Sequence, residues 1–334
     1  MNDVTYKIRV NRPCRLFIDD EEIAILDELK LAQFSLPEGE YLRKVVTIDD
    51  NTIYDEGKLT LTGVSKLENI SLTLSGLETA KKSALPKHSF KYGDLYFQSA
   101  NDKNTVEVTK GDYSFSTIEI PDVVYYSGYQ YHVKGIGEYA FQNCLTLISV
   151  TLHNHVLYIG RGAFASCENL SSVTIHEGLS TIGVNAFLKC SSLKMIIIPN
   201  SVSSIGQAAF LGCISLKSMM VKDGNAIYDS RGDCNAIIET TTNTLIVGCK
   251  NTIIPYDVTR IGRGAFCNCS SLTSITIPEC VKTFGARAFS GCTSLSSIFY
   301  SGSVAQWDIV SKGGRWHTNV PSTIIHCSDG DARI

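Results

Sequence analysis

The sequence predicts an α/β solenoid, with a parallel β-sheet and short helical turns, preceded by a small all-β sandwich. Three observations lead to this fold class. One skeleton of residues recurs every 23 positions between residues 136 and 300. Each unit contains a short run of β-forming residues, and a single unit cannot bury its apolar side alone. Residues 1–82 lack the period and alternate polar with apolar residues in short runs.

The repeat unit begins with an Ile-Gly pair, which a Phe, a Cys and a Leu follow at fixed distances. The pairs begin at Ile136, Ile159, Ile182, Ile205, Ile261 and, with Phe in place of Ile, Phe284. Successive pairs are one period apart, except that more than two periods separate Ile205 from Ile261. This longer interval is one regular period plus an extra segment. We therefore expect an inserted hairpin, at residues 222–254, in an otherwise regular array.

Strand residues alternate between the core and the exposed face of a sheet. The inward positions are Val150, Val173, Ile196, Met219 and Ile275, and the outward positions are Thr151, Thr174, Ile197, Met220, Ile253, Thr276 and Phe299. The middle of the outward column is apolar and lies beside lysines, which is typical of an interaction surface. The predicted partner-binding residues are Lys194, Met195, Ile197, Lys217, Met220 and Ile253. In the alternative, the insertion folds over these residues and buries them.

The unit IGxxAFxxCxxLxxVxIPxxVxx closely resembles the BspA-like leucine-rich repeat of bacterial surface antigens and adhesins. The resemblance covers roughly residues 88–330 and departs from the commonest leucine-rich consensus in having a Cys column instead of an Asn ladder. It divides this part of the chain into a linker and β-rich lead-in at 83–135, repeats at 136–300 and a C-terminal cap at 301–334. It implies a non-catalytic binding or adhesion protein whose partner is a protein, such as a host matrix component, or a glycan.

Residues 1–82 resemble a PEGA-like or immunoglobulin-like β module. The segment KKSALPKHS that follows has the polar, Pro-containing composition of a linker.

Twelve cysteines raise the question of disulfides and metals. Six of them form the repeat column, namely Cys144, Cys167, Cys190, Cys213, Cys269 and Cys292, and we expect these to pack in the core as small apolar side chains. If the insertion turns at residues 241–242, Ile238 faces Leu245, Ala236 faces Val247 and Cys234 faces Cys249. Opposed strand positions lie within disulfide reach. We predict a bond between Cys234 and Cys249 in an exported protein.

His153, His155 and His176 are the candidate metal ligands, because a spacing of one period stacks His153 on His176. A metal-dependent hydrolase using them is an alternative function. No general-base, nucleophile or phosphate-loop motif accompanies them. The sequence therefore predicts a protein that is not an enzyme, without cofactor or metal. The net charge of −3 gives no reason to expect a nucleic-acid partner.

The cellular compartment of the protein distinguishes the two main hypotheses, an adhesion protein outside the cell and an interaction scaffold inside it. No apolar run reaches the roughly 18 residues of a membrane helix, and the start of the chain lacks the apolar region of a signal peptide. If Met1 is the native start, we expect a cytoplasmic interaction scaffold, which abundant unpaired cysteines also favour. The family resemblance instead implies a cell-surface or secreted protein.

Overall fold

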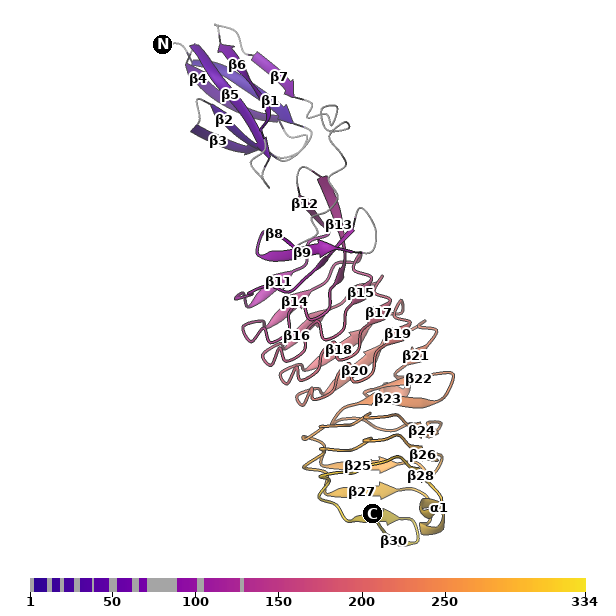
Figure 1. Ribbon diagram of the computed structural model, residues 1–334. Coiled ribbons are helices and arrows are strands. Elements are labelled where there is room, and N and C mark those ends of the chain that lie inside the picture. Colours follow the sequence, from indigo (N-terminus) through magenta and orange to yellow (C-terminus); the bar gives the residue numbers. More distant parts are fainter. Residues whose placement is uncertain are drawn as a thin grey trace. The chain divides into compact units, whose positions relative to one another are not determined.

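The structure of the chain is a computed structural model (Figure 1). It describes residues 89–100, 105–126 and 129–334, together with the backbone of seven strands before residue 89. Two compact units make up the chain, one of residues 1–92 and 123–131 and the other of residues 93–122 and 132–334.

The seven strands before residue 89 form two sheets. In one sheet β1 pairs with antiparallel β4 and parallel β7, and in the other the antiparallel order is β3-β2-β5-β6. This agrees with the all-β prediction, while the likeness to PEGA or immunoglobulin modules stays a prediction. The predicted linker KKSALPKHS lies outside the described residues except for its last residue, Ser89. The strands are β1 (Asp3–Val10), β2 (Cys14–Ile18), β3 (Glu21–Leu26), β4 (Leu31–Pro37), β5 (Gly39–Thr47), β6 (Ile53–Leu61) and β7 (Lys66–Ile70).

The second unit is the predicted solenoid, and two ladders of parallel strands run through its coils (Figure 1). Partners between regular coils are one period apart in the sequence, as in the pairing of Val150 with Val173. The longer strands are β11 (Thr117–Glu119), β14 (Ser149–Thr151), β16 (Ser172–Thr174), β18 (Met195–Ile198), β20 (Ser218–Val221), β25 (Ser274–Ile277), β27 (Ser297–Tyr300) and β29 (Ile324–Cys327).

A second ladder passes through the Ile-Gly pairs, where the sequence had not predicted strands. Its members are β13 (Tyr129–Ile136), β15 (Tyr158–Ile159), β17 (Thr181–Ile182), β19 (Ser204–Ile205), β24 (Arg260–Ile261), β26 (Thr283–Phe284) and β28 (Ser311–Lys312). The lead-in adds β8 (Phe90–Tyr92), β9 (Leu95–Ser99), β10 (Thr105–Val108) and β12 (Val123–Tyr126). β10 pairs in parallel with β13 and so begins the stack.

The segment around each Ala-Phe pair is a series of tight turns where the sequence predicted a helical turn. A positive φ interrupts the helical conformation in each coil, for example 56° at Tyr139 and 58° at Asn185. Alternate amides of each turn donate to carbonyls of the next coil, an arrangement that we call the turn ladder. In one coil the bonds run from Asn185 N to Gln207 O at 3.1 Å, from Phe187 N to Ala209 O at 2.7 Å and from Lys189 N to Leu211 O at 2.7 Å.

The turn ladder places like side chains on top of one another in the core. The rings of Phe141, Phe164, Phe187 and Phe210 stack with centroids 5.2–5.4 Å apart and planes within 6° of parallel. Cys167 beside them donates its thiol hydrogen to Phe141 O of the preceding coil at 2.9 Å, whereas the thiol of Cys144 donates to Tyr113 O at 3.6 Å. The bond to a Phe carbonyl recurs at Cys190, Cys213 and Cys292. The expected packing role of these cysteines is thus confirmed, with a hydrogen bond added.

The insertion lies within the stack of coils. Its strands β22 (Ala236–Glu239) and β23 (Thr244–Gly248) form an antiparallel hairpin, and β23 pairs in parallel with β24. A 3-10 turn, Arg231–Asp233, precedes the hairpin after β21 (Tyr228–Asp229). Arg231 forms ion pairs with Asp229 at 2.6 Å and with Asp257, which ties the insertion to the following coil.

The register of the hairpin differs in part from the prediction. Ile238 faces Leu245 as expected, but a bulge shifts the next positions so that Ile237 faces Val247 and Ala236 faces Gly248. The expected pairing of Ala236 with Val247 is therefore wrong, because one extra residue in β23 interrupts the alternation.

Two tryptophans close the core at the C-terminal end. Trp307 lies on the short helix α1 (Val304–Asp308), whose N-terminus is capped by Ser303 and Gln306. The ring centroids of Trp307 and Trp316 lie 5.6 and 5.1 Å from that of Phe284. Strand β29 continues the ladder, and the antiparallel β30 (Gly330–Arg333) ends it.

We expect Gly183→Ala to lower the free energy of unfolding by about 1–3 kcal/mol, because the backbone of the neighbouring coil leaves no room for the added carbon. A Cβ at Gly183 would lie 2.6 Å from the carbonyl carbon of Gly160 in the neighbouring coil. Gly314→Ala is the matched control, since a Cβ there meets nothing within 4 Å. Urea unfolding monitored by circular dichroism measures both variants, and equal midpoints for the two would contradict this account of coil spacing.

We also expect the protein to lose stability between pH 9 and pH 12. Burial raises the pKa of Cys167, Cys213 and Cys269 to about 12, whereas an unfolded chain has thiol pKa values of about 8.5. The stability that these neutral thiols contribute is complete below the unfolded value and is lost as the pH rises toward 12. At pH 10 the loss is about 2 kcal/mol per thiol.

Urea midpoints measured at unit steps from pH 8 to pH 11 test this pH dependence. Cys213→Ala should show a shallower decline than the parent, because one buried thiol no longer titrates. An identical slope for parent and variant would mean that other groups set the alkaline limit.

Candidate functional site

The exposed column of the longer strands is the main candidate surface. Strand alternation places Ile196 and Met219 in the core at 1% and 2% exposure, so the residues on either side of them face outward. Because β18 and β20 pair in register, Ile197 lies directly beside Met220. We call the six predicted residues the Met/Ile patch, which consists of Lys194, Met195, Ile197, Lys217, Met220 and Ile253.

The insertion leaves the Met/Ile patch open. Met195, Met220 and Ile253 are 49%, 45% and 71% exposed, and Ile197 is partly exposed. The alternative in which the insertion buries these residues is therefore wrong, because the hairpin pairs within the other ladder. Ile253 follows the hairpin, and its amide donates to Cys234 O at 3.0 Å, which brings it into the outward column.

The charges at the edge of the Met/Ile patch are positive. Lys194 and Lys217 are exposed, and neither forms an ion pair within the residues that the structure describes. Lys222, further along the chain, is paired with Glu177 at 2.8 Å. Elsewhere the column carries Thr151, Thr174 and Thr276, and Phe299, which is 43% exposed. The patch thus combines apolar side chains with two ammonium groups that form no ion pair among the described residues, next to the hydroxyl side chain of Thr174.

Two of the three predicted metal-ligand histidines lie together, but with an aspartate as the third member. Asp122 Oδ1 is 2.7 Å from Nδ1 of His155 and 3.6 Å from Nδ1 of His153, and the three potential ligand atoms lie within 4.8 Å of one another. His176 is not part of this group. Asp122 was missed because it precedes His153 by more than one period, and only the pairing of β11 with β14 brings the two strand ends together.

These three residues can make an ion pair or hold a divalent cation. Burial lowers the pKa of His153, and the charge of Asp122 only partly opposes this effect. The lowered pKa favours the neutral imidazole, which is the form that binds a metal. Its Nε2 is buried without a hydrogen-bond partner among the described residues. Within the described part of the chain, the side-chain hydrogen bonds of Asp122, His153 and His155 join these residues to one another, and none of them reaches a nucleophile or a further base.

The predicted disulfide cysteines are both buried and both free thiols here. Cys234 donates to Ala236 O at 3.8 Å, and Cys249 donates to Asn235 O at 3.3 Å. With the bulge, the two positions are no longer opposite each other in the hairpin. The bond in an exported protein stays a prediction.

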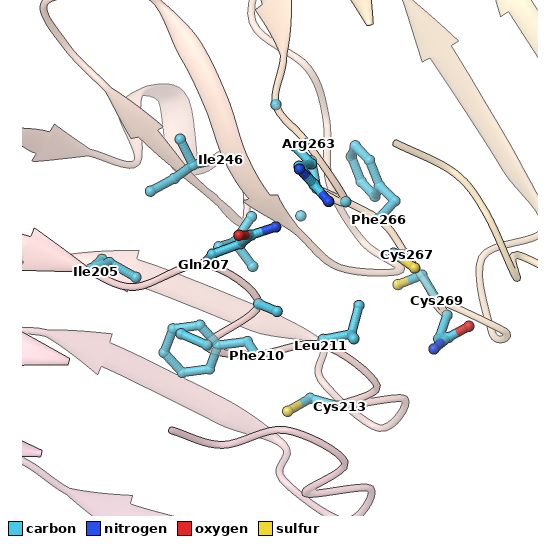
Figure 2. A pocket seen from close by; sticks show the side chains of 18 of the residues that line it. Ile205, Gln207, Phe210, Leu211, Cys213, Ile246, Arg263, Phe266, Cys267 and Cys269 are labelled. Atoms are coloured by element: carbon cyan, nitrogen blue, oxygen red, sulfur yellow. The ribbon is translucent and has the colours of Figure 1, made fainter. Parts of the chain in front are cut away.

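A cavity of about 300 Å³ lies where the insertion interrupts the repeats (Figure 2). Phe210 and Leu211 line one wall, and Arg263, Phe266 and Cys267 line the other. This cavity was not predicted from the sequence. The long interval between the Ile-Gly pairs at Ile205 and Ile261 was its signal, because an inserted segment separates two coils that would otherwise stack.

Among the described residues, no helix has the length and apolar character needed to cross a membrane.

Comparison with solved structures finds similar repeat proteins. The crystal structure of a leucine-rich repeat protein of T. pallidum is 25% identical, covers 68% of this chain and 86% of its own, and has a TM-score of 0.42. A leucine-rich repeat protein of Bacteroides capillosus is 31% identical over 40% of this chain and 98% of its own, with a TM-score of 0.35. A leucine rich cell surface protein of Faecalibacterium prausnitzii is 22% identical over 67% of this chain and 97% of its own, with a TM-score of 0.30.

A comparison with curated protein sequences finds no match. The family model described as "BspA type Leucine rich repeat region" matches residues 108–231 and 244–309 in six copies, which is more than half of the chain. The two matched ranges leave out the hairpin strand β22 and correspond to the coils on either side of it. The chain therefore belongs to the BspA-type leucine-rich repeat family.

Proposed function

We propose that this protein is a non-catalytic adhesion protein that binds a protein partner through the Met/Ile patch. The observation that carries the proposal is the exposure of Met195 and Met220 on the paired strands β18 and β20, with Ile253 exposed in the segment that follows the hairpin. Exposed clusters of apolar residues with a polar rim are characteristic of interaction sites. Membership of a repeat family whose proteins bind rather than catalyse supports the same role.

The chemistry of the patch specifies the kind of partner. Methionine side chains are flexible and polarizable, so Met195 and Met220 can adapt to an apolar segment of a partner. Lys194 and Lys217 are free to pair with carboxylates around that segment. The partner that fits best is therefore a protein with an apolar segment flanked by acidic residues, such as a host matrix component. A glycan is the less favoured partner, because the patch carries no aromatic ring.

The alternative function is an intracellular interaction scaffold. One observation favours it, namely that Cys234, Cys249 and the column cysteines are free thiols. Free thiols persist in reducing compartments, whereas exported proteins tend to form disulfides.

We expect Met220→Asp to weaken partner binding at least about tenfold, which corresponds to about 1.4 kcal/mol, while the melting temperature stays unchanged. The carboxylate would be placed on the apolar contact surface without entering the core. Thr151→Asp, two coils away from Ile197 on the same column, is the matched control. Surface plasmon resonance against purified matrix proteins and glycans, at two salt concentrations, gives the measurement. A partner that both variants bind equally well would remove the Met/Ile patch from the proposal.

Thiol counting separates adhesion from the intracellular alternative. In protein taken from the envelope fraction of its native cells, we expect the thiols of Cys234 and Cys249 to be lost to a disulfide. Alkylation without reductant, followed by mass spectrometry of the insertion peptides, measures this. Free thiols at both positions in protein found only in the cytoplasm would favour the scaffold instead.

A further inference from the structure

The turn ladder is broken at one place in the stack. In the coil that begins at Gly206, the amides of Ala208, Phe210 and Gly212 donate no hydrogen bond within the described residues. The equivalent amides of the coils on both sides of this break do donate, as from Gly264 to Ala286 O at 3.0 Å and from Phe266 to Ala288 O at 2.8 Å. Three consecutive donors of the ladder are therefore unused.

The repeat register identifies the acceptors that these donors have lost. They are the carbonyls of Arg263, Ala265 and Cys267 in the next coil. Ala265 O accepts instead from Gly248 N at 2.9 Å, and the other two accept no hydrogen bond within the described part of the chain.

The insertion causes the break by separating the two coils on one side only. On the side of the second ladder, the strands β21, β22 and β23 precede β24. On the other side the coils still touch, because Ser271 Oγ donates to Ile214 O at 2.8 Å, just as Asn169 Nδ2, at the equivalent repeat position, donates to Leu145 O at 2.7 Å between regular coils. The turns therefore move apart while the rest of each coil stays in register.

The space between the separated turns is the cavity of Figure 2, and we call it the interturn slot. The ring stack stops at Phe210 and resumes with Phe266 on Phe289, whose centroids are 4.9 Å apart. Gly248 covers one face of Phe266, since a Cβ there would lie 2.2 Å from the ring. The volume of about 300 Å³ is at the lower end of the range for ligand pockets, about 300–1,000 Å³.

We propose that the interturn slot binds a turn-forming peptide segment of a partner protein, which takes the place of the missing turn. Alternate carbonyls of the segment would accept from the amides of Ala208, Phe210 and Gly212. A Phe or Leu side chain of the segment would enter beside Phe210. This site goes beyond the Met/Ile patch, because different segments of the coils form it.

Two physical arguments favour a peptide over a small ion. Three donors at every second residue need three separate acceptors along one segment, which a polypeptide supplies and a single compact ion does not. Within the molecule, such rows are satisfied by the carbonyls of residues i, i+2 and i+4 of a neighbouring segment, such as Gln207, Ala209 and Leu211. An amide that stays buried without an acceptor costs about 1–3 kcal/mol, and each bond formed would recover part of this cost.

The direct test uses a synthetic peptide with the sequence of residues 183–190, carrying Cys190→Ser, added to the isotope-labelled full chain. This segment forms a regular turn in the molecule, so it has the geometry of the proposed occupant. We expect the amide resonances of Ala208, Phe210 and Gly212 to shift together in a nuclear magnetic resonance titration. The same peptide with Phe187→Ala is the control and should bind more weakly.

Cys267 provides a second readout, because it lines the slot and is only half-buried. Cys280 and Cys327 are also half-buried but lie outside the slot, so they are internal controls. At a peptide concentration about nine times Kd, the fraction of protein molecules with an empty slot falls to about one tenth. The alkylation rate of Cys267 should therefore fall about tenfold. The rates at Cys280 and Cys327 should not change.

Two variants complete the design. Val247→Trp fills the slot and should abolish the protection of Cys267, whereas Met220→Asp should leave it intact. The proposal would be overturned if, in the parent protein, the peptide shifted none of the three amide resonances and did not change the alkylation rate of Cys267. Water would then be the occupant of the slot. Slower alkylation at all three cysteines would also overturn the proposal, because the peptide would then bind without using the slot. Since Met220→Asp tests the Met/Ile patch separately, either site can fail without the other.

Discussion

The turn ladder is the constraint on which the rest of the solenoid depends. It forms only when each coil lies one repeat above the last, because alternate amides of one turn must meet alternate carbonyls of the next. That spacing sets the ring distance of 5.2 Å in the Phe stack and lets the thiols of Cys167, Cys190, Cys213 and Cys292 each reach a Phe carbonyl. It also leaves no room for a side chain at Gly183. A residue type at one repeat position therefore becomes a column through the molecule.

Columns explain how a repeat protein concentrates a binding surface without a special fold. Three of the seven outward positions are threonine, and apolar residues at Ile197 and Met220 create the Met/Ile patch without altering the core beneath it. Ile196 and Met219 remain buried under Ile197 and Met220. The insertion is long enough to have covered this face. Its strands pair instead with the second ladder, because β23 finds a parallel partner in β24 and so satisfies its backbone.

The same insertion has a cost at the turns, where three amides lose their acceptors. A regular array has such unsatisfied edges only at its ends, and here the Trp307 and Trp316 rings and the strand β30 close the C-terminal end. An interior edge of this kind is a defect in packing and, for the same reason, a place where another backbone can pair. The Met/Ile patch and the interturn slot thus arise in two different ways. The patch comes from a change of side chains in the outward column, and the slot comes from a gap in the hydrogen bonds of the turn ladder.

The sequence by itself determined the solenoid, its coil boundaries, the inward and outward columns and the core role of the cysteines. It could do so because a fixed period repeats the same residue pattern in every coil. An ambiguous position in one coil can therefore be assigned from the equivalent positions of the others. It did not determine the turn conformation, the second ladder, the bulge that moves Ala236 opposite Gly248, or the grouping of Asp122 with His153 and His155. Each of these depends on contacts between segments that the period does not relate. Whether the Met/Ile patch was open, and where the turn ladder broke, were decided only by where the insertion found a strand to pair with.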